Sequence, residues 1–142
     1  MKSTQGGATT IELALVLLVF LMFLLGVTDM SRMLFTWNAA TEATRVGARF
    51  AVVCADTANQ AQVIGKMRKM VPEIGAVALT WEPAGCTTAT CEGVTVTITD
   101  LNYHWISPVI GVIVPPRAMP TFSTYLPREM MRQDPNNALI CQ

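Results

Sequence analysis

One unbroken apolar run dominates the first part of the chain. Leu13–Val27 is continuously apolar, and the wider stretch 8–28 adds only Glu12 and small or hydroxyl-bearing residues. As a helix, these 21 residues would span about 31 Å, which is close to the hydrocarbon thickness of a bilayer. Because the run is apolar on every face and the remaining 114 residues could not easily enclose it, we predict a membrane-spanning helix rather than a buried core helix.

Helical periodicity continues beyond the apolar run. Residues 29–53 contain no proline and are rich in Ala and Met, which favours one continuous helix. Small residues within it would allow another backbone to approach closely. The residues expected to face the rest of the protein are Ala40, Ala43, Val46, Gly47 and Phe50, and those expected in solvent are Glu42, Arg45, Arg49 and Asp56.

A second helix is predicted from about Ala58 to Val71. Asp56 or Thr57 would cap its start, and Pro72 would end it. Its expected apolar face comprises Val63, Ile64, Met67, Met70 and Val71, with Lys66, Arg68 and Lys69 on the outer side.

The apolar period then changes to two. Apolar residues alternate with small or hydroxyl-bearing residues over 77–81 and 94–98, which predicts two strands with one buried face. A third strand is predicted near Thr121–Leu126. The expected fold class is therefore α+β, in which a long N-terminal transmembrane helix continues into a head with a second helix packed on a small antiparallel sheet.

Another apolar segment, Ile106–Pro116, lies between the second and third predicted strands. Its eleven residues (ISPVIGVIVPP) are too few to cross a bilayer. The composition favours a buried core segment. The alternative is an exposed apolar patch that contacts another component.

Composition and charge narrow the functional classes. Hydrophobic residues make up 51% of the chain, charged residues only 14%, and ten Lys and Arg balance ten Asp and Glu. Nucleic acid binding needs a clustered positive excess, so we expect no nucleic acid partner. Motifs such as G-x-S-x-G, the P-loop and H-E-x-x-H are absent from the sequence, and His104 is the only histidine. We therefore expect no catalytic residues, metal, cofactor or small-molecule substrate, and predict that the protein is not an enzyme.

The four cysteines favour disulfides if the head lies in an oxidising compartment. Cys86 and Cys91 flank four residues between two predicted strands, an arrangement suited to a local bridge. Cys54 and Cys141 would then pair by elimination, although three pairings are possible. The C-x-x-C spacing of thiol redox sites and the tighter ligand pairs of zinc sites are both absent from the sequence.

A short polar leader, MKSTQGG, precedes the apolar run, and Glu12 lies near the start of that run. A carboxylate at the membrane edge costs on the order of 1–3 kcal/mol unless it finds a partner, which suggests a function for it. An ordinary signal peptide would need a small-x-small cleavage site after the apolar core, and Gly26-Val27-Thr28 fits this poorly.

The segment Gly7-Ala8-Thr9-Thr10-Ile11-Glu12-Leu13-Ala14 resembles the processing site of type IV pilin-like proteins. In those proteins a prepilin peptidase cuts after a glycine and leaves a glutamate fifth in the mature chain. More narrowly, the chain resembles the TadE/TadF family, minor pseudopilins of the Tad (Flp) tight-adherence pilus. Further similar stretches are 39–49, 94–108 and 128–129. The early proline common in the membrane helix of relatives is absent from residues 13–25.

The resemblance implies a domain organisation and a set of partners. Residues 1–7 would form a cytoplasmic leader, 8–28 a helix in the inner membrane, and 29–142 a periplasmic head. Cleavage between Gly7 and Ala8 would expose an amine that pairs with Glu12 of a neighbouring subunit, and Leu13 follows in the same motif. The implied partners are the inner membrane, the prepilin peptidase, other pilus subunits and the assembly platform proteins. The protein would serve pilus assembly, adhesion and secretion, whether in the fibre, at its tip or only in the machinery.

Two other functional classes remain open on the sequence alone. An uncleaved bitopic periplasmic protein could use the same anchor and bind partners through its head as a scaffold. A membrane-tethered thiol oxidoreductase would use the cysteines and would contain free thiols. Cleavage after Gly7 would distinguish the pilin-like protein from the scaffold.

Overall fold

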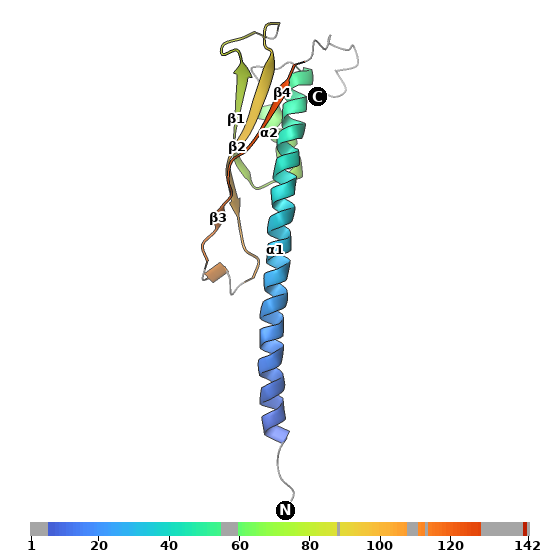
Figure 1. Ribbon diagram of the computed structural model, residues 1–142, viewed down its shortest axis with the longest axis vertical. Helices are drawn as coiled ribbons and strands as arrows, with labels where there is room; N and C mark the ends of the chain where they lie inside the picture. Colours follow the sequence, from blue (N-terminus) through green and yellow to red (C-terminus); the bar gives the residue numbers. More distant parts are fainter. Residues whose placement is uncertain are drawn as a thin grey trace, which may run out of the picture.

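A single long helix, α1 (Gly6–Cys54), forms the axis of the computed structural model. It is followed by α2 (Gln60–Met70) and four strands, β1 (Ile74–Glu82), β2 (Gly93–Tyr103), β3 (Arg117–Ala118) and β4 (Phe122–Pro127). Figure 1 shows α2 and the sheet beside the C-terminal half of α1, whereas the N-terminal half extends alone. The predicted α+β fold class is confirmed.

The structure describes residues 6–54, 60–87, 89–107, 111–112, 114–128 and 141. Several expectations fall outside these residues. They concern most of the leader, the capping residues Asp56 and Thr57, the solvent position of Asp56, and part of Ile106–Pro116.

β2 is the central strand of the sheet. β1 pairs with it along one edge, with Trp81 opposite Val94, and β4 pairs along the other, with Phe122 opposite Ile98. All of these pairings are antiparallel. The two-residue β3 extends the second edge opposite the end of β2, and it was not predicted because two residues show no periodicity.

The core lies between one face of the sheet and the small side chains of α1. Val94, Val96 and Ile98 are buried, while the intervening threonines of β2 are half-buried, as a period of two requires. Opposite them, α1 presents fully buried residues of minimal size, namely Ala40, Ala43, Ala48 and Ala51. Because these side chains are short, the helix lies close to the sheet.

One expected core residue of α1 is exposed. Val46 has 41% of its surface accessible and does not face the head as predicted. Each residue turns the helix by about 100°, so Val46 falls on the stripe of Glu42 and Arg49 rather than on that of Ala43 and Gly47. On this solvated stripe, Arg45 and Glu42 form an exposed ion pair at 2.7 Å.

Helix α2 packs against α1 at Gly47. A Cβ atom at this glycine would lie 2.6 Å from Sδ of Met67, which is closer than a packed core tolerates. Val63 and Met67 are buried as predicted, but Met70 is 43% exposed because the next residue, Val71, takes the buried position where the helix ends.

Arg68 has a structural role that the sequence did not suggest. Its Nε donates a hydrogen bond to the backbone carbonyl of Ile74 at 3.0 Å, and its Nη2 donates one to the backbone carbonyl of Gly75 at 2.8 Å. Arg68 lies on the outer side of α2, as expected, and its guanidinium fastens the turn from α2 to β1.

Candidate functional site at the junction of helix and head

The residues of the proposed processing motif lie on the first turns of α1. Ala8, Glu12 and Leu13 are exposed, and a Cβ atom at Gly7 would meet nothing within 4 Å. Figure 1 shows this end of α1 far from the sheet, so the structure brings none of these residues to the head.

The N-terminal half of α1 exposes large apolar side chains on all sides. Phe23 is 73% exposed, Leu13 68% and Leu24 44%. None of the most apolar 18-residue window is buried within the protein, and α1 is long and apolar enough to cross a membrane. A soluble monomer rarely exposes so large an apolar surface, which fits a membrane anchor.

Asp29 ends the apolar run and is 2% exposed. Its two carboxylate oxygens accept hydrogen bonds from the backbone N–H groups of Ile106, at 3.1 Å, and Ser107, at 3.0 Å. The backbone carbonyl of Asp29 accepts a third hydrogen bond from the Tyr103 hydroxyl at 2.9 Å. Asp29 therefore fastens the end of β2 and the segment after it to α1, at the point where the apolar run stops.

The surroundings keep Tyr103 in its donor form. Burial raises the pKa of the Tyr103 phenol above its ordinary value, and the nearby positive charge of Arg32 only partly opposes this effect. The phenol is therefore protonated at neutral pH and donates to Asp29. Trp105 lies edge-on to the Tyr103 ring at 5.3 Å, and its Nε1 donates to the carbonyl of Pro115 at 3.3 Å.

This junction was not predictable from the sequence. Asp29 is an acidic residue just beyond an apolar run, but the groups that it binds lie 74 to 78 residues further along the chain. The segment Ile106–Pro116, whose composition favours a core position, is exposed at Ile106 (61%) and Val112 (88%). The core interpretation is wrong for these residues, because the connection from β2 to β3 runs down beside α1, beyond the sheet that would cover it (Figure 1).

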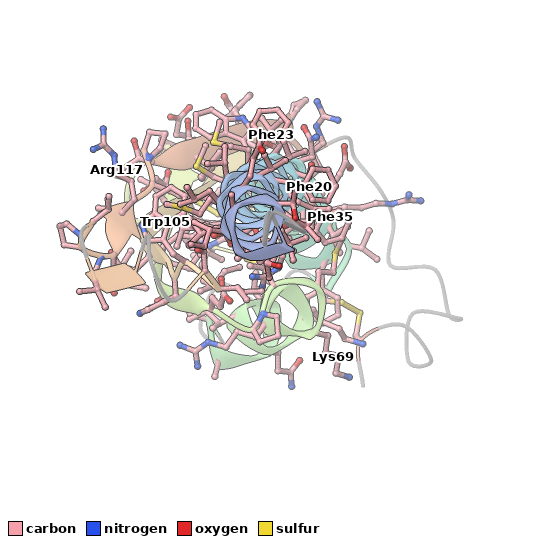
Figure 2. All side chains as sticks on the ribbon, turned by 90° about the horizontal axis from the view of Figure 1, so that it is seen from below. Phe20, Phe23, Phe35, Lys69, Trp105 and Arg117 are labelled. Carbon is pink, nitrogen blue, oxygen red and sulfur yellow. A yellow bond between two sulfur atoms is a disulfide. The ribbon has the colours of Figure 1, made fainter. Side chains whose placement is uncertain are left out.

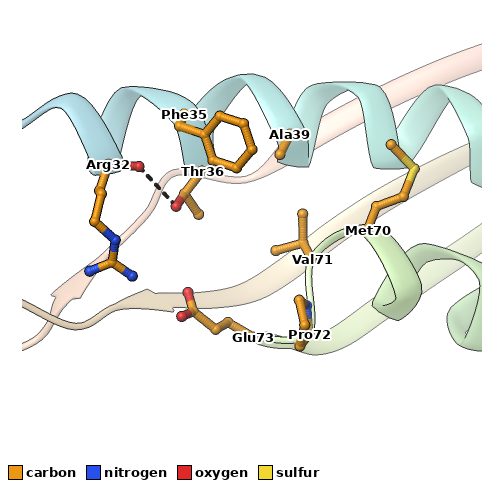
Figure 3. A pocket seen from close by; sticks show the side chains of 8 residues that line it. All are labelled: Arg32, Phe35, Thr36, Ala39, Met70, Val71, Pro72 and Glu73. Atoms are coloured by element: carbon orange, nitrogen blue, oxygen red, sulfur yellow. Dashed lines mark hydrogen bonds between the residues drawn. The ribbon is translucent and has the colours of Figure 1, made fainter.

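A small pocket lies one to three turns above Asp29, with a cavity volume of about 200 Å³. Figure 3 shows Arg32 and Phe35 of α1 on one wall, and Pro72 and Glu73 of the turn after α2 on the other. In the part of the chain that the structure describes, no three His, Cys, Asp or Glu side chains are grouped so that they could hold a metal ion. The pocket combines one cation and one carboxylate with apolar walls, and this set contains no nucleophile activated by a base.

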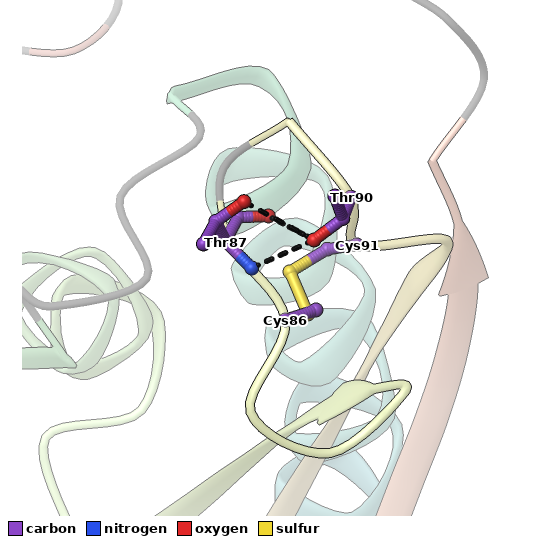
Figure 4. Close-up of a disulfide and its surroundings, with 4 residues drawn as sticks. All are labelled: Cys86, Thr87, Thr90 and Cys91. Atoms are coloured by element: carbon purple, nitrogen blue, oxygen red, sulfur yellow. Dashed lines mark hydrogen bonds between the residues drawn. A yellow bond between two sulfur atoms is a disulfide. The ribbon is translucent and has the colours of Figure 1, made fainter.

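All four cysteines are paired. The structure joins Cys54 to Cys141, with Cα atoms 5.6 Å apart, and Cys86 to Cys91, with Cα atoms 5.0 Å apart. These are the two pairs considered from the sequence. Figure 4 shows the second bridge closing the loop after β1, where the backbone N–H of Thr87 donates to the hydroxyl of Thr90 at 2.9 Å.

Comparison with known proteins finds a similarity within α1. Residues 7–49 match the family model of the TadE-like proteins. No curated protein and no solved structure matches the chain significantly. The matched stretch contains the exposed apolar half of α1, Asp29, and part of the face that packs on the sheet. The resemblance to the TadE family is thus confirmed over these residues, and the segment 7–49 of this chain is TadE-like.

Proposed function

We propose that the protein is a minor pilin-like subunit, anchored in the inner membrane by α1, which takes part in assembling a Tad-type pilus. One observation carries the proposal. The TadE-like match lies within a helix whose most apolar 18-residue window has no buried residue in the monomer. Such a surface has to be covered by lipid before assembly, and it can pack against other subunits when the pilus assembles. The role is structural rather than enzymatic.

The proposed maturation step is cleavage between Gly7 and Ala8 by a prepilin peptidase. Gly7 has open space around it, so the fold itself places no demand for glycine there. A glycine that packing does not require is consistent with recognition by another protein.

Glu12 would then guide assembly. It is exposed on the apolar part of α1, where an unpaired carboxylate costs on the order of 1–3 kcal/mol in a membrane. The new amine of Ala8 on a neighbouring subunit offers a partner of opposite charge. In a low-dielectric setting an unpaired charge is unfavourable, so the pair would favour one axial register between helices.

The proposed topology follows from charge and disulfides. Residues 1–7 would lie in the cytoplasm with Lys2 as the inside positive charge, 8–28 would span the membrane, and 29–142 would form the periplasmic head. Both disulfides lie in the head, which fits an oxidising compartment.

An exposed face of α1 above the membrane supplies a surface for other subunits. Phe35 is 74% exposed although it lies beyond the proposed spanning segment. Viewed along the helix in Figure 2, Phe35 and Phe20 lie on the opposite side of α1 from Trp105. The apolar surface therefore continues from the membrane segment into the head, as helix packing between subunits would require.

The test is the intact mass of the protein extracted from its native membrane. A chain that begins at Ala8 is expected. A chain that retains MKSTQGG would overturn maturation and favour the uncleaved scaffold protein, whereas a chain that begins near Ser31 would identify an ordinary signal peptide and remove the anchor.

A further inference from the structure

We propose that the described residues between β2 and β3, namely 105–107, 111–112 and 114–116, enter the outer leaflet of the membrane beside α1, and that the groove between them and α1 holds a phospholipid acyl chain. The head would then contact the membrane at a second place besides its anchor. The inference rests on the proposed insertion of residues 8–28.

Two of these described residues expose large apolar side chains. Val112 is 88% exposed and Ile106 61%. Exposure of these apolar side chains to water is energetically unfavourable, and an exposed apolar patch of this kind marks a contact with protein or membrane.

The depth to which the groove extends identifies lipid as its occupant. Seven residues of α1 line it on one side, and Trp105 and Val114 line it on the other, around a cavity of about 690 Å³. Of the seven, Met22, Phe23, Gly26 and Val27 belong to the proposed spanning segment, whereas Met30, Ser31 and Leu34 lie just beyond it. Met22 lies seven residues before Asp29, which is about 10 Å along a helix and so at the level of the acyl chains.

Hydrogen bonds hold the segment at this depth. In an apolar medium the N–H groups of Ile106 and Ser107 would be costly to leave unpaired, and the Asp29 carboxylate accepts both. Trp105 adds a side chain that favours the boundary between acyl chains and headgroups.

Polar residues bracket the apolar segment. His104 precedes it and Arg117 follows it, and both are exposed. Figure 2 shows Trp105 and Arg117 on the same side of α1. Arg117 is therefore placed where it can meet the phosphate of a headgroup while Val112 enters the apolar layer.

The test is the quenching of tryptophan fluorescence by lipids brominated on their acyl chains. The variant Trp37→Phe/Trp81→Phe retains only Trp105, and the control Trp37→Phe/Trp105→Phe retains only Trp81. Trp81 lies at the end of β1 that leads to the Cys86–Cys91 loop, away from the proposed membrane. In nanodiscs with one copy each, brominated lipid should remove about half of the Trp105 emission or more, and little of the Trp81 emission.

A second pair of variants controls for misfolding. Val112→Asp should abolish most of the Trp105 quenching, because a carboxylate resists entry into the acyl layer, while Val112→Leu should leave it intact. At 88% exposure, Val112 contributes little to the packing of the head, so both variants should fold. Equal quenching in the two would contradict insertion of this segment.

Other outcomes separate this inference from the proposed anchor. If alkaline washing removes the protein from membranes, the anchor itself is wrong. If the protein stays in the membrane but brominated lipid does not quench Trp105, only the present inference is wrong. Shielding of Trp105 from aqueous iodide that requires several copies in one liposome would instead assign the groove to a second subunit.

Discussion

Asp29 joins α1 to the head at the point where the apolar run stops. Its carboxylate and its backbone carbonyl together accept hydrogen bonds from three groups, one at the last residue of β2 and two in the segment after it. The acid itself is plain in the sequence, but its role is not, because hydrogen-bond partners more than 70 residues away leave no local pattern. For Glu12, in contrast, the sequence indicates a role that the structure of the monomer does not explain. Its position in the apolar run marks it as a candidate functional residue, although the structure gives it no role within the monomer's head.

Asp29→Ala should detach the segment after β2. The change leaves the N–H groups of Ile106 and Ser107 without their acceptors, at about 1–3 kcal/mol for each buried group that stays unpaired. Hydrogen exchange at these two amides should accelerate, and the free energy of unfolding should fall. Asn38→Ala, an exposed change on the same helix, is the control. Unchanged exchange in Asp29→Ala would show that these hydrogen bonds do not hold the segment.

Tyr103 should make the stability of the protein depend on alkaline pH. Its pKa is raised in the folded state, so above the ordinary phenol pKa of about 10 the unfolded state loses the proton first. The contribution of Tyr103 is therefore fully present below this pH and is lost as pH rises through its folded pKa. Denaturation curves should show a steeper alkaline loss for the natural protein than for Tyr103→Phe. Identical slopes would contradict the prediction.

Glu12→Leu should separate insertion from assembly. Leucine suits the lipid better than a carboxylate does, so the variant should fractionate with membranes as the natural protein does. It should nevertheless fail to support normal pilus formation, seen by electron microscopy of the native host. Gly7→Val tests the preceding step and should leave the leader attached. Normal pili with Glu12→Leu would remove the proposed pairing role.

At the scale of elements, periodicity predicted what is long and regular. The two helices and the strands β1, β2 and β4 each span enough residues for a period of 3.6 or 2 to show. The path of Ile106–Pro116 was not predictable in this way. Its residues are as apolar as those of a core segment. Its position beyond the sheet is determined by the length of β2 and by the hydrogen bonds of Asp29.

The contact of α1 with α2 depends on a glycine that fits its partner. Gly47→Ala should lower the free energy of unfolding by about 1–3 kcal/mol, because the added Cβ overlaps the buried Met67 side chain. Gly65→Ala is the matched control, since Gly65 lies in α2 with nothing within 4 Å. This control should be neutral or stabilise by up to about 1 kcal/mol through helix propensity. Chemical denaturation in detergent measures both, and equal effects would refute the close approach.

At the scale of the molecule, the two disulfides should differ in their contributions. In the chain-entropy treatment, the bridge across 87 residues stabilises by about 4–5 kcal/mol, and the bridge across 5 residues by about 2 kcal/mol. Replacing Cys54 and Cys141 by serine should therefore lower the melting temperature more than replacing Cys86 and Cys91. Thermal unfolding followed by tryptophan fluorescence compares the two double variants. A larger loss from the short loop would contradict this ranking.

The Cys54–Cys141 bridge also determines how the head would bear a mechanical load. It joins the last residue of α1 to a point beyond β4, so that α2 and all four strands lie within one covalent ring. Tension between the shaft of α1 and Cys141 would pass through the sulfur bridge and bypass the sheet. Under a pull from the proposed fibre or its machinery, the bridge would keep the strands from separating one after another.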